Sequence, residues 1–381
     1  MKRVFFYVQH LLGIGHVFRA LRIARGLREA GFAVDLVLGG VPVSGLDLSD
    51  FNVIQLLPLK AGPQGFSELV TATGEPADAT IKAHRETQLL AAYAECRPDV
   101  VLIEAFPFGR RQVRFELMPL LQAIHASSPR PRVFSSIRDI LQESRKPERA
   151  RETVDVLQRY FDRVIVHGDP RLARLEETFP LASEIAQMLH YSGIVAPQMP
   201  SPDVPPSHLA DVVISAGGGA VGAGLIEAAI AAKPLTSLAS SRWLVLTGPY
   251  VEDATFDKLA VLGQAAGVTV EHFVPDLTSV LTHARLSVSQ AGYNTVADVL
   301  VAGCKSVFIP FARGGETEQT RRAHLLREQG VGITLAEECL EPAALASAID
   351  QAIALPIAAI KLDADGAAKT ATILAKQLAS A

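Results

Sequence analysis

Short apolar runs alternate with longer amphipathic segments through the first half of the chain. Two of the amphipathic segments, 17–30 and 77–96, carry apolar residues at helical spacing. This alternation is typical of a parallel sheet covered by helices on both faces. We therefore predict strands at 4–8, 34–38, 53–57, 100–103, 133–136 and 164–167.

A proline-rich segment, 197–207, interrupts the alternation and suits an extended linker. The same pattern then resumes, with strands predicted at 211–216, 243–247, 268–270, 286–289 and 307–309 and helices at 225–232, 342–354 and 365–378. A chain of 381 residues is long enough for two such domains. We predict an α/β protein with an N-terminal domain at 1–196, a second domain at 208–360 and a terminal helical segment at 361–381. Packing of that last segment against the first domain is left open.

Composition narrows the class of protein. Hydrophobic residues make up 49% of the chain, the net charge is −4 and no basic block is present, which argues against nucleic acid as the main partner. The three cysteines are widely spaced and odd in number, as expected in a reducing compartment. No apolar run is long enough to predict a membrane-spanning helix. We expect a cytoplasmic protein, with peripheral contact at the inner face of a membrane left open.

A glycine-containing turn follows the first predicted strand and leads into a helix. Gly13 and Gly15 let the backbone bend sharply and approach a ligand, and His16 then stands at the helix start. A histidine there can remove a proton from a hydroxyl or a water, or it can merely cap the turn. Arg19, one turn along, is either a ligand-binding residue or a solvated helix residue.

Two further turns of this kind occur in the second half. Residues 215–224 contain five glycines, of which Gly217, Gly218 and Gly219 can form a cradle of backbone amides for phosphate. In the segment 290–298, Asn294 and Thr295 are either helix caps or ligand contacts. Asp298 can bind a ribose diol or be an exposed helix residue. Glu318 and Gln319, at a later helix start, can contact sugar hydroxyls or be ordinary polar residues.

These motifs resemble the GT-B glycosyltransferases, and in particular glycosyltransferase family 28. Residues 290–298 are similar to the signature His-Cys-Gly-Trp-Asn-Ser-x-x-Glu of nucleotide-sugar transferases, with Gly292 and Asn294 in common. Glu318-Gln319 resembles the Asp-Gln pair that closes this signature. The resemblance implies two Rossmann-like parallel-sheet domains that face each other across a cleft. One departure is Gln290, which stands where the signature has histidine.

The resemblance also implies that several residues of the second domain bind a nucleotide-sugar donor. Thr295 would contact the donor phosphates, Asp298 the ribose, and Glu318 with Gln319 the transferred sugar. Phe273 would flank the nucleobase and the backbone of Val274 would read its edge. The residues expected to bind the donor are Gly217, Gly218, Gly219, Phe273, Val274, Gly292, Asn294, Thr295, Asp298, Glu318 and Gln319.

The leading hypothesis is an inverting, metal-independent glycosyltransferase that moves a sugar from a nucleotide diphosphate sugar, expected to be UDP-linked, to a hydroxyl acceptor. No cofactor beyond the donor is expected. His16 would deprotonate the acceptor, and Glu104, at the end of a predicted strand, would orient it, in the position where related plant enzymes carry an aspartate. Glu104 can alternatively be a pocket-wall carboxylate without a catalytic role.

The acceptor is less well defined by the sequence. Phe106 can line an apolar wall for a lipid-linked or glycan acceptor, or it can close the core. Arg138 can bind an anionic acceptor or pair with Asp139 at the surface. The turns that begin at Ser136 and His167 also follow predicted strands, but no motif assigns a ligand to them.

Two other functions remain open at this stage. Residues 13–19 also resemble the Gly-x-Gly-His-x-x-Arg turn of a nucleotide-sugar hydrolase of pseudaminic acid synthesis, in which His16 would activate water. A non-catalytic nucleotide-sugar-binding protein is the second alternative, and Gln290 in place of histidine is its support.

Overall fold

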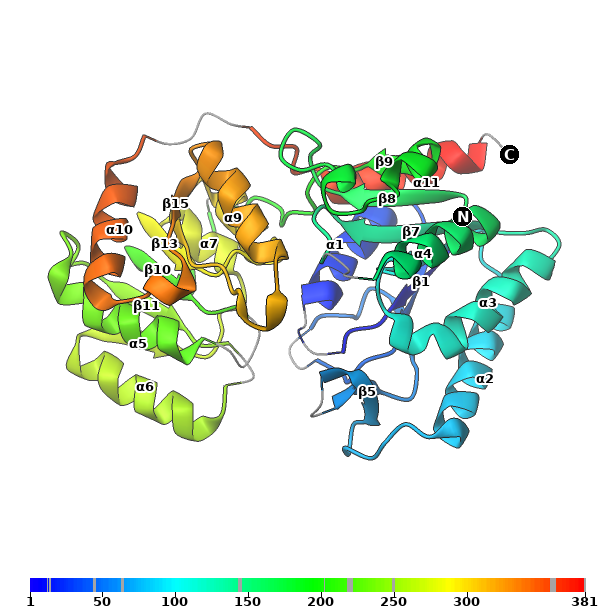
Figure 1. The fold of residues 1–381 in the computed structure, drawn as a ribbon, viewed down its shortest axis with the longest axis horizontal. Helices are drawn as coiled ribbons and strands as arrows, with labels where there is room; N and C mark the ends of the chain where they lie inside the picture. The colour runs from blue at the N-terminus through cyan, green and yellow to red at the C-terminus, as the bar shows by residue number, and fades with distance from the viewer. Residues whose placement is uncertain are drawn as a thin grey trace. The chain divides into compact units, whose positions relative to one another are not determined.

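Seven parallel strands form the sheet of a first unit, which comprises Met1–Val195 and Asp365–Ala381. The structure is a computed structural model that describes residues 1–11, 13, 15–43, 46–62, 65–142, 146–201, 203–217, 222–248, 251–356 and 361–379. In spatial order the strands are β3 (Asn52–Gln55), β2 (Ala33–Leu38), β1 (Arg3–Val8), β6 (Val100–Glu104), β7 (Arg132–Arg138), β8 (Arg163–His167) and β9 (Leu189–Tyr191) (Figure 1).

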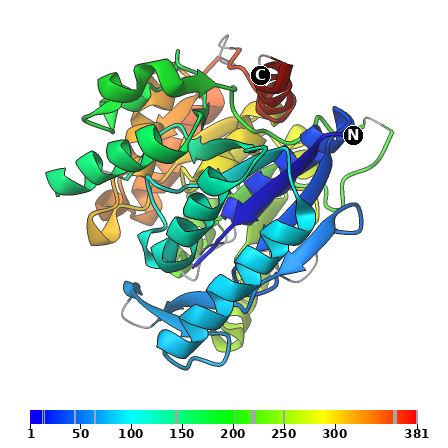
Figure 2. The same cartoon turned by 90° about the vertical axis from the view of Figure 1, so that its right-hand side faces the viewer.

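Both faces of this sheet are buried. In β1, Phe5 and Tyr7 belong to one core cluster, and Val4, Phe6 and Val8 belong to the other. Side chains alternate between the two faces of a strand, so this split shows apolar packing on each side. The first cluster contains residues of α2 (Ala79–Cys96), α3 (Arg114–Ala126) and α4 (Pro147–Tyr160), and Figure 2 shows α2 and α3 in cyan along the sheet.

The other face is covered by helices from the two ends of the chain. The second cluster contains residues of α1 (Gly15–Glu29) and α11 (Gly366–Ala379), which pack against each other. A Cβ atom on Gly26 would lie 2.9 Å from Ala367, so glycine is what permits this close approach. Where the chain returns to this unit, Val195 forms an antiparallel bridge with Asp365 and the Gly366 amide donates to the Ile194 carbonyl at 3.0 Å.

The second unit, Ala196–Ala364, has a sheet of six parallel strands. Their order is β12 (Val268–Glu271), β11 (Trp243–Leu246), β10 (Val212–Ser215), β13 (Leu286–Ser289), β14 (Lys305–Phe308) and β15 (Gly332–Thr334). Its helices are α5 (Ala223–Ala232), α6 (Asp253–Ala265), α7 (Leu277–Thr282), α8 (Tyr293–Ala302), α9 (Glu318–Glu328) and α10 (Pro342–Ala354). The core cluster of this unit joins the sheet to α5, α6 and α10.

The predicted α/β class, with two parallel sheets, is confirmed. Three features escaped the sequence pattern: the short edge strands β9 and β15, and an antiparallel hairpin of β4 (Leu59–Gly62) and β5 (Gly65–Thr71). Edge strands of three residues carry too little periodicity to be recognised. Among the described residues, no helix combines the length and the apolar character needed to span a membrane.

Strand order locates where ligands are expected. The sheets change direction between β1 and β6 in the first unit and between β10 and β13 in the second. Ligands of open α/β sheets bind outside the carboxyl ends of the strands at such points. The turn before α1 and the turn before α8 both lie at carboxyl ends beside these positions. Each unit therefore presents one predicted site region at the expected edge of its sheet.

Candidate functional site

His16 and Glu104 form a hydrogen bond at the carboxyl edge of the first sheet. His16 is the second residue of α1, which follows β1, and Glu104 is the last residue of the adjacent strand β6. The imidazole Nδ1 lies 3.0 Å from the carboxylate Oε1. Glu104 is fully buried, whereas the His16 side chain keeps 21% of its surface exposed. The neighbouring strands thus bring the predicted base and its predicted orienting carboxylate together.

Arg19 belongs to the same cluster. Its guanidinium pairs with Oε1 of Glu104 and its Nη2 lies 3.3 Å from Nδ1 of His16. The side chain is 3% exposed, so the interpretation of Arg19 as a solvated helix residue is wrong. One helical turn separates Arg19 from His16, which places both side chains on the same face of α1. Arg19 therefore supplies the buried positive charge that Glu104 requires.

The second oxygen of Glu104 accepts from Ser136, the first of three buried residues to which the sequence assigned no role. The Ser136 hydroxyl, on β7, donates to Oε2 of Glu104 at 2.8 Å. The same hydroxyl lies 2.8 Å from Nε2 of His167, at the end of β8, and Nδ1 of His167 lies 2.9 Å from the Ser192 hydroxyl. Ser136, His167 and Ser192 are all fully buried. Ser136 and His167 lie at the ends of predicted strands, which was their only signal in the sequence, and Ser192 lies outside every predicted strand.

Burial and charge determine the ionisation of this cluster. Burial raises the pKa of Glu104, but the positive charge of Arg19 and the hydrogen bond from His16 outweigh it and hold this pKa far below its usual range. Burial, with the nearby charge of Arg110, lowers the pKa of His16 to about 3. Burial, with the charge of Arg19, lowers the pKa of His167 to about 3. At neutral pH the cluster therefore holds an ionised Glu104 and two neutral histidines.

This arrangement determines which nitrogen of His16 is basic. An ionised carboxylate only accepts hydrogen bonds, so Nδ1 of His16 carries the proton and donates to Glu104. Nε2 then holds the lone pair and can accept a proton from a hydroxyl group. No described residue occupies Nε2 with a hydrogen bond. The geometry is that of a general base held by a carboxylate.

The remaining residues predicted on the acceptor side differ in their surroundings. Phe106 is 1% exposed within the core cluster of the first unit, so it closes the core and does not line an acceptor wall. Arg138 is half-buried at the end of β7. Asp139 is buried and accepts from the Ile140 amide at 2.8 Å. Gly13 is exposed, and Gly15 is the first residue of α1.

Arg110 was not anticipated from the sequence. It follows β6 in a left-handed backbone conformation and its Nε donates to the Gln9 carbonyl at 2.7 Å. Burial lowers the pKa of Arg110 to about 10, so the side chain is still charged at neutral pH. The charges of Glu104, Arg138 and Arg19 also act on it. Arg110 and Arg138 thus add positive charge next to the His16 cluster.

In the second unit, the signature segment forms the beginning of α8. The helix starts at Tyr293 with Gly292 as its N-cap, and no side-chain hydrogen bond caps it. Asn294 and Thr295 lie in the first turn, so the interpretation of these residues as N-caps is wrong. The first turn of a helix has backbone amides without intrahelical partners, and these attract anions. This is the geometry expected for a phosphate-binding helix start.

Arg322 holds this turn in place. The side chain is 1% exposed, and its Nη1 donates to the Ala291 carbonyl at 3.1 Å and pairs with Glu318 at 2.7 Å. Its guanidinium also lies over the Tyr293 ring, 5.6 Å from the centroid. Glu318, predicted to contact sugar hydroxyls, is thus buried beside a cation of its own helix. The neighbouring Gln319 accepts from the Phe311 amide at 3.1 Å.

Asp298 and the proposed base-binding residues have distinct environments. Asp298 is 7% exposed and accepts from the Thr278 hydroxyl at 3.2 Å, so it is not an exposed helix residue. Phe273 is 51% exposed and Val274 is buried. Beside them the rings of His272 and Phe256 stack with centroids 3.7 Å apart. An exposed phenyl ring next to a buried residue suits a stacking surface for a planar ligand.

A cavity of about 400 Å³ lies at the carboxyl edge of the second sheet. Gln290 lines it together with the start of α5 and residues that follow β14, including Phe311 and Arg313. Gly217 has a φ of 77°, and a Cβ atom there would lie 3.2 Å from Oε1 of Gln290. Gly218 and Gly219 lie outside the described residues. Gln290 therefore faces the glycine-rich turn at the point where the strand order changes.

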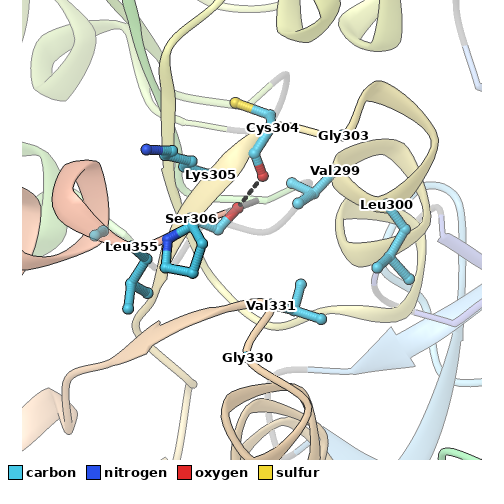
Figure 3. Close-up of a pocket in the computed structure, with 11 residues that line it drawn as sticks. Val299, Leu300, Gly303, Cys304, Lys305, Ser306, Gly330, Val331 and Leu355 are labelled. Carbon is cyan, nitrogen blue, oxygen red and sulfur yellow. Dashed lines mark hydrogen bonds between the residues drawn. The ribbon is translucent and has the colours of Figure 1, made fainter. Parts of the chain in front are cut away.

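A smaller cavity of about 60 Å³ lies at the opposite edge of the same sheet (Figure 3). Its lining includes Cys304 and Lys305 at the start of β14 and Gly330 before β15. Strand amino ends are not where ligands of such sheets bind. Burial raises the pKa of the Cys304 thiol to about 12, which makes it unreactive. We assign no function to this cavity.

Two parallel-sheet units, each with a glycine-containing turn at the carboxyl edge, define the GT-B class of fold. Among solved structures, MurG of Acinetobacter baumannii is similar with a TM-score of 0.63 and 18% identity, over 99% of this chain and 100% of that protein. The calicheamicin glycosyltransferase CalG4 is similar with a TM-score of 0.61 and 17% identity, over 100% of this chain and 94% of that protein. At such identities the likeness concerns the fold.

Residues 213–378 match the glycosyltransferase family 28 C-terminal domain. The second half of the chain therefore resembles the C-terminal domain of family 28, and the fold of the whole chain is similar to that of GT-B proteins. One relative, the UDP-N-acetylglucosamine–N-acetylmuramyl-(pentapeptide) pyrophosphoryl-undecaprenol N-acetylglucosamine transferase of Cellvibrio japonicus, is 32% identical over 24% of this chain and 26% of its own length. The same enzyme of Lacticaseibacillus casei is 33% identical over 32% of this chain and 34% of its own length. The chain matches only about a quarter to a third of these relatives.

Proposed function

We propose that the protein transfers a sugar from a nucleotide diphosphate sugar to a hydroxyl acceptor, with inversion at the anomeric carbon. The observation that carries the chemistry is the hydrogen bond between His16 and Glu104, which leaves Nε2 of His16 basic. The family match of residues 213–378 supports a donor site in the second unit. The relatives are named for a UDP-linked sugar, which supports UDP as the donor nucleotide.

The second unit supplies groups suited to the donor. The uncapped first turn of α8 offers amides to a diphosphate, and the exposed ring of Phe273 offers a stacking face to a nucleobase. The 400 Å³ cavity beside Gln290 is of the size that small-molecule sites have. Gln290 is uncharged, so its contact with a phosphate or sugar would be a neutral hydrogen bond. Asp298, which accepts from the Thr278 hydroxyl, would hold the ribose.

The reaction is a single displacement. Nε2 of His16 removes the proton of the acceptor hydroxyl, whose oxygen attacks the anomeric carbon. The bond from that carbon to the phosphate oxygen breaks, and the nucleotide diphosphate leaves with the electron pair. Attack from the face opposite the leaving group inverts the configuration. Glu104 stabilises the imidazolium that forms on His16, as a carboxylate does in other histidine-based sites.

Stabilisation of the leaving group is proposed to be independent of a metal ion. Backbone amides at helix starts can stabilise the developing charge of the diphosphate. The chain contains one Asp-x-Asp sequence, at 363–365. The backbone of Asp365 pairs with Val195 where the chain returns to the first unit, which is a structural use of this segment.

The donor assignment is tested by thermal shift with UDP, GDP, CDP and dTDP and their sugars. A ligand that binds only the native state raises the melting temperature, and we expect the UDP series to give the largest shift. Phe273→Ala should reduce the shift. Val261→Ala is the matched control, since Val261 is another exposed apolar residue of the second unit. The absence of a shift with every nucleotide would contradict a donor site.

Transfer is tested separately by counting products. The protein is incubated with the bound nucleotide sugar, with and without lipid-linked and glycan acceptors, and both free sugar and glycosylated product are measured. A transferase gives product only when an acceptor is present. Release of free sugar at the same rate in every mixture would identify a hydrolase and overturn the proposal.

A further inference from the structure

A chain of buried hydrogen bonds extends from the proposed base across the carboxyl edge of the first sheet. It runs from His16 to Glu104 at 3.0 Å, from Glu104 to Ser136 at 2.8 Å and from Ser136 to His167 at 2.8 Å. It ends at Ser192, whose hydroxyl lies 2.9 Å from His167 and 3.1 Å from the Gly193 carbonyl. The residues come from α1, β6, β7, β8 and the segment after β9, so four neighbouring strands hold the chain together.

The charge on Glu104 gives this chain a direction. Both oxygens of an ionised carboxylate are acceptors, so Ser136 must donate its single proton to Glu104. The Ser136 oxygen can then only accept from His167, which places a proton on Nε2 of His167. Nδ1 of His167 is therefore the acceptor for the Ser192 hydroxyl. The ionised state of Glu104 thus fixes the direction of the hydrogen bonds as far as His167, and the Ser192 hydroxyl has both Nδ1 of His167 and the Gly193 carbonyl as acceptors within reach.

We propose that Ser136 and His167 are positioning residues that hold Glu104 so that His16 presents Nε2 to the acceptor hydroxyl. This inference rests on the proposed role of His16 as the base. Without Ser136, the buried oxygen Oε2 would have no donor among the described residues, and the orientation of the carboxylate beside His16 would no longer be fixed. Without the Nε2 proton of His167, the Ser136 hydroxyl could turn from Glu104 to His167. Either loss would leave the His16 imidazole less firmly oriented by Glu104.

The charged groups near these hydrogen bonds lie on α1, after β6 and after β7. Arg19 on α1 pairs with Glu104 and lies near both histidines. Arg110, after β6, acts on His16, and Asp139, after β7, acts on His167. Arg19 and Arg110 oppose protonation of His16, whereas Glu104 favours it. Removing the Ser136 donor would leave more of the negative charge of Glu104 to stabilise the protonated form of His16.

The experiment compares Ser136→Ala with Ser135→Ala. Both serines lie on β7, both are fully buried and each donates one hydrogen bond, but Ser135 donates to the Phe106 carbonyl on the other face. We expect Ser136→Ala to lower kcat on the order of ten- to a hundredfold with KM nearly unchanged, because the base is misplaced. In the pH profile of kcat, the acid limb, where activity is lost as the pH falls, should lie at higher pH for Ser136→Ala than for the wild type. Ser135→Ala should match the wild-type profile. Equal kcat values and equal acid limbs in the two variants would overturn the proposal.

His167 variants provide a rescue test. The amide nitrogen of glutamine can replace Nε2 of histidine, whereas asparagine is too short to reach Ser136. We expect His167→Gln to keep most of the activity and the wild-type acid limb, and His167→Asn to behave like Ser136→Ala. Circular dichroism melting of every variant separates loss of positioning from loss of folding. Equal activity of the two His167 variants, at equal melting temperatures, would contradict the proposal.

His16→Gln separates this inference from the proposed function. If His16→Gln retains wild-type turnover, His16 is not the base, and both proposals fail together. If His16→Gln is inactive while Ser136→Ala and Ser135→Ala remain indistinguishable, the base assignment stands and only the positioning role is wrong.

Discussion

The Nδ1 atom of His16 and the Oε1 atom of Glu104 lie 3.0 Å apart, although the two residues are 88 positions apart in the chain. Parallel pairing of β1 with β6 brings the turn before α1 next to the end of β6. Arg19 reaches the same carboxylate from one turn further along α1. A buried carboxylate held by an arginine and a histidine is an arrangement that supports a base and leaves little freedom for it to move.

Replacing the proposed base should remove turnover without unfolding the protein. His16→Gln deletes the basic nitrogen, and general-base catalysis contributes about 10²- to 10⁴-fold in rate, so kcat should fall by that order. His84, on α2, is exposed, and His84→Gln is the matched control with expected wild-type activity. Steady-state transfer rates and melting temperatures are measured for both. A kcat within a factor of a few of wild type would exclude His16 as the base.

kcat/KM should not fall near pH 6.5, where an ordinary histidine base becomes protonated. His16 acts as a base only when neutral, and its pKa is lowered to about 3, so activity is lost only as the pH falls towards that value. The control is the free donor, whose stability is followed over the same pH range. A limb between pH 6 and 7 that disappears in His16→Gln would show that the histidine is less perturbed than its burial implies.

Acid should destabilise the first unit through His167. In the unfolded chain this histidine binds a proton below its usual pKa of about 6.5, whereas in the folded protein it does so only near about 3. The unfolded state therefore binds more protons between these values, and the free energy of unfolding falls as the pH falls through this window. His167→Gln should flatten that dependence in urea unfolding measured from pH 7 to pH 4. An unchanged slope would contradict the assignment.

Arg322 should be required for the stability of the signature turn. Arg322→Met leaves Glu318 buried without its cation and removes the donor to the Ala291 carbonyl, and breaking such a buried pair costs about 3–5 kcal/mol. Arg327→Met, at an exposed position of the same helix, should cost little. Urea unfolding gives the free energies, and the UDP thermal shift reports on the turn. Equal effects of the two substitutions would mean that Arg322 has no special role.

Chelation should leave the reaction rate unchanged. If backbone amides stabilise the departing diphosphate, EDTA in excess over all divalent ions should alter the initial rate by less than a factor of about two. Asp363→Asn removes one carboxylate of the Asp-x-Asp sequence and should be equally neutral. A rate that collapses in EDTA and returns with Mg²⁺ or Mn²⁺ would show that a metal ion takes part.

Much of the fold could be predicted from periodicity. The strands of both sheets other than the edge strands β9 and β15 were recognised, and the helix at 342–354 was placed at its observed bounds. The role of Arg19 was left open because a charged side chain on a helix is usually solvated. Here Glu104 is buried within reach and compensates the cost of burying the guanidinium. Phe106 was ambiguous because an apolar residue after a strand suits a ligand wall and a core equally well.

The sequence by itself determined the class of fold, the turns at the carboxyl ends of strands, and the two residues proposed as base and carboxylate. These follow from local patterns and from motifs in which neighbours along the chain act together. Only the tertiary structure revealed the hydrogen bonds that connect Glu104, Ser136 and His167. The same is true of the hydrogen bond from Arg322 to the turn before α8. Those contacts join residues that lie 31 or 32 positions apart, and they depend on strand order and on burial. Periodicity records which face of an element is buried, but not which element lies beside it.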